Sequence, residues 1–269
     1  MNLETYRIGP DSTFSLAECD PGDTAGLTDK KAAKKDLKAV RKRIRALQER
    51  LWAEKRQSLL VILQATDTGG KDGTISHVFR DVNQQGCRVY AFKEPTEIEL
   101  AHDFLWRCHQ QTPPDGFITI FNRSHYEDVL VARVKNLVEQ PVWERRYGQI
   151  NDFERLLGEN GTHILKFFLH ISREEQKERL QARLDDPEKN WKFSKGDLAD
   201  RALWDDYQAA YHDTIARCST DVAPWYVIPA DYKWFRNLLV ARIIEKTLIE
   251  MNPQFPEPES GLDDIVIPD

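Results

Sequence analysis

Five short apolar runs recur along the chain, and an amphipathic, helix-compatible segment follows each of them. The runs occupy residues 58–65, 87–92, 116–121, 163–171 and 225–230. The segments that follow them, in the same order, occupy residues 71–84, 97–109, 126–137, 174–184 and 232–251. Continuous apolar runs of this kind are typical of strands buried on both faces of a parallel sheet. The alternation predicts an α/β fold with a parallel, doubly wound sheet, whose ligand site lies at the carboxyl ends of the strands.

One more amphipathic helix, residues 30–56, precedes the first run. Its apolar residues recur at steps of three and four and form one stripe: Leu37, Val40, Ile44, Leu47 and Leu51. Twelve Lys or Arg residues stand in this segment against three acids, so it carries a formal charge of +9. Because the whole chain carries −6, the other residues carry −15. The basic face of this helix is either a wall that holds a phosphate chain or an ordinary solvated surface.

The two ends of the chain and one internal stretch differ in composition from the rest. Residues 1–29 and 252–269 are rich in Pro, Gly and Asp. This predicts an extended N-terminal arm and a C-terminal tail on either side of a catalytic domain, residues 30–251. The polar residues 185–195 interrupt the rhythm of strand and helix. Together with the helix before them, they predict a lid at about residues 179–200.

Length and composition exclude several classes of protein. The 269 residues, 41% of them hydrophobic, are enough for one α/β domain with extensions and argue against a mainly disordered chain. No apolar stretch reaches the roughly 18 to 20 residues of a membrane span, and the N-terminus lacks the blocks of a signal peptide, so we expect a cytosolic protein. The four cysteines are scattered, which argues against a zinc site or a disulfide framework: Cys19, Cys87, Cys108 and Cys218.

A glycine-containing loop, residues 65–74 (ATDTGGKDGT), joins the first run to its helix. Glycines allow successive backbone N–H groups to point inward, the helix N-terminus adds partial positive charge, and Lys71 can reach a transferring phosphate. The candidate phosphate-binding residues are Thr68, Gly69, Gly70, Lys71, Asp72, Gly73 and Thr74. The loop departs from the pattern G-x-x-x-x-G-K-[ST], because Ala65 replaces the first glycine and Asp72 replaces the hydroxyl residue that binds Mg²⁺. Asp67 is therefore the natural compensating ligand for Mg²⁺, and a merely structural turn is the alternative.

A second polar cluster, residues 122–128 (NRSHYED), follows the third run. Arg123 offers a planar guanidinium for phosphate oxygens. Oxygen ligands for a hard cation are available from Asn122, Glu127 and Asp128. The two acids also suit the first turn of a helix, where negative charge is favourable. His125 is either a base or a packed histidine.

Basic residues gather in the predicted lid and after the second run. Arg179 and Arg183 lie four apart, hence on one face of a helix, and Lys192 follows in the polar stretch. Arginines that face a cleft neutralise phosphate charge in the transition state, and a solvated basic face is the alternative. Lys93 is a candidate contact for a nucleotide phosphate, although Pro95 beside it also suits a purely structural turn.

With these motifs the chain resembles the polyphosphate kinase 2 family, and more narrowly its class III branch. The segments ATDTGGKDGT, FNRSHYEDVL, LQARLDDPEKNWKF and APWYVIPADYKWFRN appear in the family's order, and the similarity extends from about Tyr6 to Phe255. The resemblance implies a three-layer α/β/α fold of the P-loop kinase type with a helical lid. It also implies reversible, Mg²⁺-dependent transfer of a phosphoryl group between inorganic polyphosphate and AMP or ADP, with Mn²⁺ as an alternative metal.

The resemblance also implies roles for single residues. The catalytic residues that match the family's motifs are Asp67, Lys71, Arg123 and Arg183. Asn122 stands where other classes of the family carry Asp, whereas Glu127 and Asp128 belong to the class III form of the motif. The implied partners are polyphosphate and adenine nucleotides, with guanine nucleotides as an alternative, and a second or further copies of the chain in a homodimer or homotetramer. Neither nucleic acid nor a membrane is an expected partner.

Two other functions stay open from the residues alone. A nucleoside monophosphate kinase that takes its phosphate from ATP would share the loop and the lid. A non-catalytic module that binds polyphosphate would share the basic surface. Neither needs both the long basic helix and the grouping of Asp67, Lys71 and Arg123 at strand ends.

Overall fold

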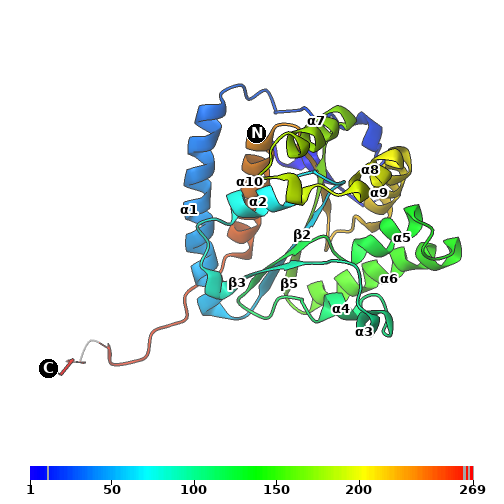
Figure 1. The fold of residues 1–269 in the computed structure, drawn as a ribbon. Coiled ribbons are helices and arrows are strands. Elements are labelled where there is room, and N and C mark those ends of the chain that lie inside the picture. The colour runs from blue at the N-terminus through cyan, green and yellow to red at the C-terminus, as the bar shows by residue number, and fades with distance from the viewer. Residues whose placement is uncertain (11, 263–264, 266, 269) are drawn as a thin grey trace.

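A six-stranded sheet runs through the centre of the molecule, seen here in a computed structural model that describes residues 1–10, 12–262, 265 and 267–268 (Figure 1). The strands are β1 (Arg7–Ile8), β2 (Ser58–Gln64), β3 (Cys87–Ala91), β4 (Ile118–Asn122), β5 (Thr162–His170) and β6 (Trp225–Pro229). Their order across the sheet is β1-β6-β5-β2-β4-β3. Strands β2 to β6 are parallel, whereas β1 pairs with β6 in the antiparallel direction. The five apolar runs are thus confirmed as the strands of a parallel, doubly wound sheet.

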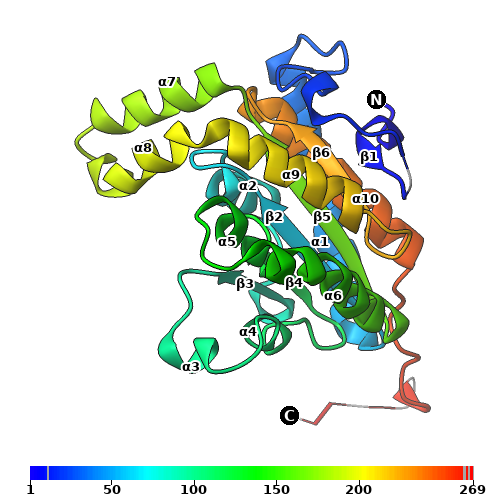
Figure 2. The ribbon, with the colours of Figure 1, turned by 90° about the vertical axis from the view of Figure 1, so that its right-hand side faces the viewer.

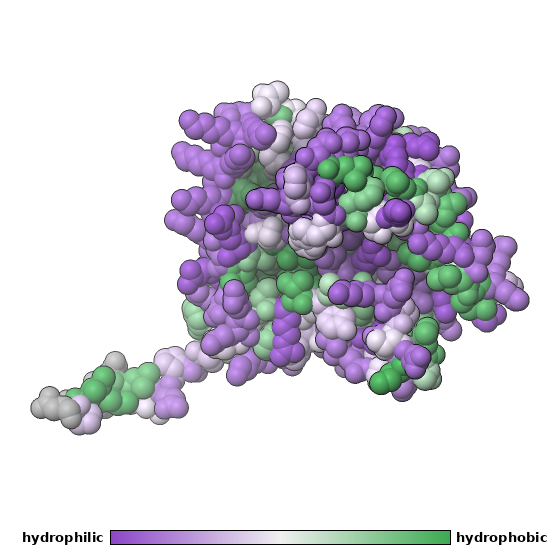
Figure 3. All heavy atoms as spheres, in the orientation of Figure 1, coloured by the Kyte–Doolittle hydropathy of each residue, from purple (hydrophilic) through white to green (hydrophobic). Residues whose placement is uncertain are grey.

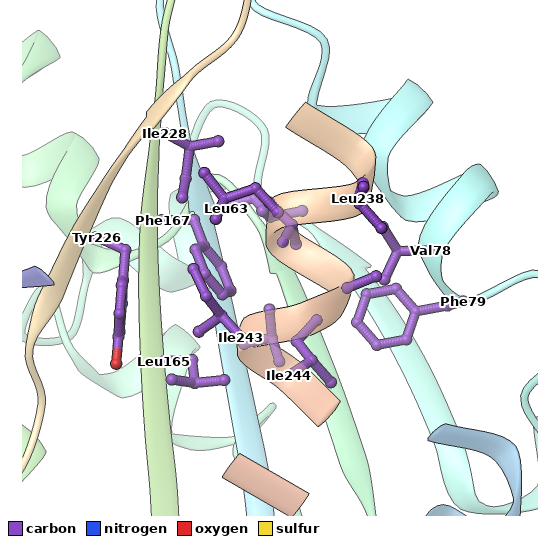
Figure 4. Close-up of a cluster of buried hydrophobic side chains, with 14 of the residues drawn as sticks. Leu63, Val78, Phe79, Leu165, Phe167, Tyr226, Ile228, Leu238, Ile243 and Ile244 are labelled. Atoms are coloured by element: carbon purple, nitrogen blue, oxygen red, sulfur yellow. The ribbon is translucent and has the colours of Figure 1, made fainter. Parts of the chain in front are cut away.

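Two layers of helices cover the sheet, because successive side chains of a strand point to opposite faces. The principal helices are α1 (Lys30–Glu54), α2 (Lys71–Val78), α6 (Gln140–Glu159), α9 (Trp204–Cys218) and α10 (Lys233–Met251). Leu63 of β2 belongs to the buried cluster of Figure 4, together with Val78 of α2 and Leu238 of α10. Its neighbours Leu60 and Ile62 belong to a second cluster, which includes buried residues of α6 and α9. The three-layer α/β/α fold is confirmed.

Two of the predicted helices are broken into shorter pieces. Residues 97–109 hold α3 (Glu97–Leu100) and α4 (Trp106–His109). Between them Asp103 Oδ1 accepts hydrogen bonds from the backbone N–H groups of Leu105 and Trp106, in the turn that leads into α4. Residues 126–137 likewise contain the end of a 3₁₀ helix (His125–Asp128) and the short α5 (Val131–Val134). The prediction of one continuous helix in each segment is wrong.

The region predicted as a lid consists of helices that project from the body. Helices α7 (Arg173–Leu184) and α8 (Lys195–Ala202) extend together beyond the sheet in Figure 2, and a 3₁₀ turn (Asn190–Lys192) lies in the segment between them. Ser172 Oγ accepts the backbone N–H of Glu175 and caps α7 where it leaves β5. This arrangement places the side chains of α7 next to the carboxyl ends of the strands.

The basic helix α1 packs its apolar stripe against the body. Leu37, Val40, Ile44 and Leu51 are buried, as the spacing predicts. The ion pairs of α1 with other parts of the fold involve two of its arginines and Asp36. Its lysines stay exposed and form no ion pair with the described residues: Lys30, Lys31, Lys34, Lys35, Lys38 and Lys42. Figure 3 shows hydrophilic side chains along this edge of the molecule.

The N-terminal residues pack on the body. Tyr6 is 7% exposed, meets the ring of Phe235 edge-on and donates its hydroxyl proton to Asp23 at 2.6 Å. The chain leaves the body again after α10 (Figure 1). Residue 11 of the predicted arm and residues 263, 264, 266 and 269 of the predicted tail lie outside the described residues. The division at residues 29 and 251 stays a prediction. None of the described helices is both long and apolar enough to cross a membrane.

Candidate functional site

The loop between β2 and α2 requires two adjacent glycines. A Cβ atom on Gly69 would lie 2.4 Å from the Cβ of Ala65, which is closer than two carbon atoms approach. Gly70 has a φ of +99°, and a Cβ there would lie 1.9 Å from Nη1 of Arg236. The loop therefore closes tightly on itself and on α10. Lys71 follows at the start of α2, and its Nζ donates to the carbonyl oxygen of Ala65 at 2.9 Å.

Replacement of Gly70 by alanine is expected to lower kcat/KM by about 10-fold to 100-fold, because the left-handed backbone and the contact with Arg236 both oppose a Cβ atom. Steady-state kinetics of the phosphoryl transfer that the sequence predicts will measure the loss. Gly148→Ala is the matched control, since nothing lies within 4 Å of a Cβ there. Equal activity of the two variants would show that the loop does not need the observed conformation.

Burial changes the proton affinity of Lys71. Burial and the neighbouring guanidinium of Arg123 lower the pKa of Lys71 to about 8, although Asp67, Glu127 and Asp72 act in the opposite direction. An anionic ligand stabilises the charged form of a lysine that is buried in this way. The loop is thus prepared for a phosphate rather than for a neutral group.

The second polar cluster meets the loop because β4 lies next to β2. Leu63 is in register with Asn122, and the backbone N–H of Arg123 donates to the carbonyl oxygen of Leu63 at 3.1 Å. Arg123 has a φ of +64°. Its guanidinium lies 3.2 Å from Asp67 Oδ1 and 3.4 Å from Glu127 Oε2. These charges, with Glu127 the strongest, keep the pKa of Arg123 above its ordinary value despite burial.

Beside that ion pair, the amide of Asn122 binds the loop directly. Its Nδ2 donates to Asp72 Oδ1 at 2.6 Å. Asn122 and Asp72 both line the cleft described below, so two oxygen-bearing side chains from different strand ends face the same space. Glu127 instead lines a chamber of about 30 Å³ behind Asp67 and Arg123, which has room for one or two water molecules.

Asp128 and His125 lie away from these groups. Asp128 Oδ1 is 3.2 Å from Arg146 Nη1, and burial raises the pKa of Asp128 although Arg146 opposes this. His125 is fully buried, and its Nε2 lies 3.2 Å from Glu154 Oε1. Of the two interpretations of His125, the packed histidine is therefore confirmed. The structure does not bring Asp128 together with Asp67.

A buried ionic network lies directly beneath the second cluster. Lys166 of β5 donates from Nζ to Glu154 Oε2 at 2.6 Å and to the hydroxyl oxygen of Tyr126 at 2.8 Å. The Tyr126 hydroxyl donates in turn to Glu154 Oε1 at 2.8 Å. All three side chains are inaccessible to solvent. Since Tyr126 and His125 are both bound to Glu154, the network fixes the segment that places Arg123 and Glu127.

A cleft of about 850 Å³ opens between these strand ends and α7. Most of the predicted site residues line it: Asp67, Thr68, Gly69, Gly70, Lys71, Asp72, Gly73, Asn122, Arg123, Arg179, Arg183 and Lys192. Four others do not line it: Thr74, Lys93, Glu127 and Asp128. Thr74 is buried and donates its hydroxyl proton to the carbonyl oxygen of Gly70 at 3.1 Å. The exposed Lys93 accepts on its carbonyl oxygen a hydrogen bond from Arg107.

The two lid arginines have different surroundings. Arg179 is 8% exposed and donates to the carbonyl oxygens of Thr68 and Ala230 at 3.0 and 2.6 Å, so it ties the loop to the end of β6. Arg183 lies further out, 3.2 Å from Asp197 Oδ2 of α8 and 2.9 Å from the carbonyl oxygen of Lys192. The first arginine positions the loop, and the second remains at the cleft wall with one carboxylate partner.

Comparison with known proteins identifies the family to which this arrangement belongs. The family model described as Polyphosphate kinase 2 matches residues 27–256, which is most of the chain. The chain belongs to the polyphosphate kinase 2 family. Among curated members it is 56% identical over 266 residues to the AMP/ADP-polyphosphate phosphotransferase of Meiothermus ruber, covering 98% of this chain and all of that protein. It is 45% identical to the ADP-polyphosphate phosphotransferase of Rhodopseudomonas palustris over 77% of this chain and 76% of that one.

A solved structure of the family has the same fold. The crystal structure of polyphosphate kinase 2 from Arthrobacter aurescens TC1 superposes with a TM-score of 0.94 and 46% identity, over 97% of this chain and 93% of that chain. The family membership expected from the motifs is confirmed. This family member is a phosphotransferase with a P-loop kinase-like fold.

The side chains at the cleft suit a magnesium ion that is bound mainly through its substrate. Mg²⁺ in phosphoryl-transfer sites is held by one or two carboxylates together with phosphate oxygens and water. Among the described residues no group of three or more His, Cys, Asp or Glu side chains is arranged to hold a metal. Asp67, Asp72 and Asn122 offer hard oxygen donors at the cleft. This donor set fits Mg²⁺ and disfavours metals that prefer sulfur or nitrogen ligands.

Two cleft residues of this polyphosphate kinase 2 family member are missing from the candidates that the sequence provided. Lys233 and Arg236, in the first turn of α10, line the cleft, and Arg236 lies against Gly69 and Gly70 of the loop. They follow the last parallel strand, β6, just as the loop follows β2. The rule that ligands bind at the carboxyl ends of parallel strands could have found them, since they lie within the segment APWYVIPADYKWFRN that carries the resemblance to the family.

Proposed function

We propose that this polyphosphate kinase 2 family member transfers the terminal phosphoryl group between inorganic polyphosphate and AMP or ADP, as class III members of the family do. The relative named AMP/ADP-polyphosphate phosphotransferase supports this over its whole length. The observation that carries the proposal is the meeting of Lys71, Asp67 and Arg123 at one cleft that has room for a nucleotide and a phosphate chain. Phosphoryl transfer depends mainly on positioning and neutralised charge, which these residues supply.

Each residue has a defined part in the proposed reaction. Lys71 and the loop N–H groups hold the transferring phosphate. Asp67 would hold Mg²⁺, or Mn²⁺ as the alternative, and Asn122 and Glu127 would bind the metal through its water ligands. When bound there, the metal neutralises charge on the phosphate oxygens. Arg123 moves from its carboxylates to phosphate oxygens, and Arg183 does the same from the lid. Asp128 is bound to Arg146 and does not line the cleft, so it has no direct part in this proposal.

The surroundings of the reaction form part of the same proposal. Long polyphosphate chains bind along the six exposed lysines of α1, outside the cleft. Adenine nucleotides are the acceptors, with guanine nucleotides as the alternative. The enzyme works in the cytosol as a homodimer or homotetramer. Light scattering tests the assembly. The basic helix is tested by measuring how the reaction rate falls with salt concentration, once with long-chain polyphosphate and once with tripolyphosphate as the donor. Only a donor that contacts many lysines is expected to lose its activity steeply with salt.

The purified protein is expected to convert AMP to ADP and ATP when given polyphosphate and Mg²⁺, and to lose this activity when a chelator removes the metal. Chromatography of the nucleotides measures both products. Asp67→Asn is expected to reduce the rate at least about 100-fold, because it removes the metal's carboxylate. The control is Asp115→Asn, an exposed acid that forms no ion pair with the described residues.

Three results would contradict the proposal. Faster phosphorylation of AMP from ATP than from polyphosphate would indicate a nucleoside monophosphate kinase. Binding of polyphosphate without turnover would indicate a binding module. Equal rates for Asp67→Asn and the wild type would remove Asp67 from the mechanism.

A further inference from the structure

Thr68, in the loop between β2 and α2, has a backbone conformation that threonine rarely adopts. Its φ is +62°, in the left-handed region. A β-branched residue is strained there, and such strain persists only where the surrounding contacts fix it. Strain of this kind is concentrated at functional sites, and Thr68 lines the cleft. The contacts that hold its backbone therefore bear on what the loop can bind.

Two side chains of α7 hold the peptide groups on either side of Thr68. Gln176 donates from Nε2 to the carbonyl oxygen of Asp67 at 3.2 Å. Arg179 donates from Nη1 to the carbonyl oxygen of Thr68 at 3.0 Å. Both side chains are buried, with exposures of 2% and 8%. Gln176 thus fixes the peptide group that precedes the strained residue, and Arg179 fixes the one that follows it.

Helix α8 determines how the amide of Gln176 is oriented. Its Oε1 accepts a hydrogen bond from Arg201 Nη1 at 2.8 Å, and the same Nη1 donates to the carbonyl oxygen of Arg173 at 2.7 Å. A guanidinium can only donate hydrogen bonds, and a backbone carbonyl oxygen can only accept them. The amide oxygen of Gln176 therefore points to Arg201, and its nitrogen points to the loop.

The contact between Gln176 and Asp67 also sets the direction of the next N–H group. In a planar trans peptide the C=O and the following N–H point in opposite directions, so the N–H of Thr68 points away from Gln176. Gln176 lines the small chamber behind Asp67 but not the cleft. The N–H of Thr68 donates to no backbone acceptor among the described residues. It is thus available to an oxygen atom bound in the cleft.

We propose that Gln176 is a positioning residue for phosphoryl transfer. It turns the peptide group between Asp67 and Thr68 so that the N–H of Thr68 donates to a substrate phosphate, and Arg201 supports it from α8. Gln176 itself acts only through the loop backbone. The inference rests on the proposed function, because it assigns this N–H to the phosphate of that reaction. A donor that is oriented before the substrate binds stabilises developing charge most effectively.

The variants Gln176→Leu and Gln176→Glu test this role by kinetics. Leucine removes both hydrogen bonds of the amide. A glutamate carboxylate still accepts from Arg201 but has no proton to donate to the carbonyl oxygen of Asp67. Both variants are expected to lower kcat at least about tenfold and to change KM for AMP less than about twofold, because the displaced donor acts on the transition state. Since leucine adds no charge, a loss shared by both variants is not an effect of the carboxylate.

Two further variants complete the kinetic test. Gln181→Leu is the matched control on α7, because Gln181 is exposed and its amide binds Asp185 outside the cleft. Arg201→Met tests the support from α8. If Arg201 acts through the amide, adding Arg201→Met to Gln176→Leu is expected to cause no further loss. Losses that multiply in the double variant would show that Arg201 acts separately and would overturn its place in the proposal.

Nuclear magnetic resonance of threonine-labelled protein gives a readout that does not depend on turnover. In the wild type the amide proton of Thr68 is expected to shift downfield when tripolyphosphate is added, because it then donates to an anionic oxygen. The signal is assigned by its loss in Thr68→Ser. In Gln176→Leu the shift is expected to be smaller. Should this variant fail to fold, Gln176→Glu takes its place, since it keeps the contact with α8.

Each outcome has one meaning. Wild-type kcat in Gln176→Glu overturns the proposal, because the contact with Arg201 would then be enough and Gln176 would only dock α7 on α8. A Thr68 shift that is the same with and without Gln176 also overturns it, even if the variant has lost activity. If the shift depends on Gln176 but the wild type transfers no phosphoryl group, the proposed function fails and the orientation of the loop by Gln176 remains.

Discussion

Replacement of Lys71 by methionine is expected to reduce kcat about 10³-fold while the protein stays folded. Methionine keeps most of the side-chain volume but removes the charge that holds the transferring phosphate, and preorganised charge is the main source of catalysis in such sites. Folding does not need this charge, since burial already lowers the pKa of Lys71 to about 8. Single-turnover transfer from polyphosphate to AMP measures the effect on chemistry.

Lys177→Met on α7 is the control for this experiment, because Lys177 is exposed and lies outside the cleft. A loss of less than about tenfold in Lys71→Met would contradict the assigned role. The pH dependence provides a second test. Lys71 is cationic below about pH 8 in the free enzyme and loses its proton above it, so KM for polyphosphate is expected to rise above pH 8. In Lys71→Arg this rise is expected to disappear, because the guanidinium stays charged.

Strands β2, β4, β5 and β6 could be predicted because they are mostly buried on both faces and so leave a strong apolar signal, whereas the edge strand β3 is mostly exposed. Every residue of β2 and β6 is buried. Strand β1 leaves no such signal, since two residues cannot show a period, and its pairing with β6 depends on how the N-terminal segment packs. The break between α3 and α4 was equally hidden. Asp103 suits a helix surface, and only the folded chain shows that it binds the backbone of a turn between two helices.

The candidate site, like the fold, could be predicted from the sequence only in part. The loop could be predicted from its glycines and Lys71, because those residue types are required by local backbone geometry. Asp128 could not be excluded from the metal ligands by its position in the chain. It turns away because Arg146 of α6 binds it, and that partner lies 18 residues further on. Arg236 lies within the segment APWYVIPADYKWFRN, but only the folded chain shows that it is buried against the carbonyl oxygen of Gly69 in the loop.

Replacement of Glu154 by alanine is expected to lower the free energy of unfolding by about 3–5 kcal/mol. Burial alone would raise the pKa of Glu154, but Lys166 and His125 reverse this, so the carboxylate is ionised in the folded protein at neutral pH. Its removal leaves the Lys166 ammonium buried with neutral acceptors, Tyr126 and the carbonyl oxygen of Cys218. Denaturant unfolding at pH 7 measures the loss.

A double variant separates the charge from the shape of this network. Glu154→Leu with Lys166→Met removes both ions and keeps most of the volume, so its stability is expected to return to within about 1 kcal/mol of the wild type or to exceed it. If the network serves to fix the segment that carries Arg123, this stable double variant should still have a lower kcat, because Tyr126 and His125 have lost Glu154 as their common partner. Full activity in the double variant would show that the network stabilises the fold alone. A stable Glu154→Ala protein would contradict the burial of an ion pair there.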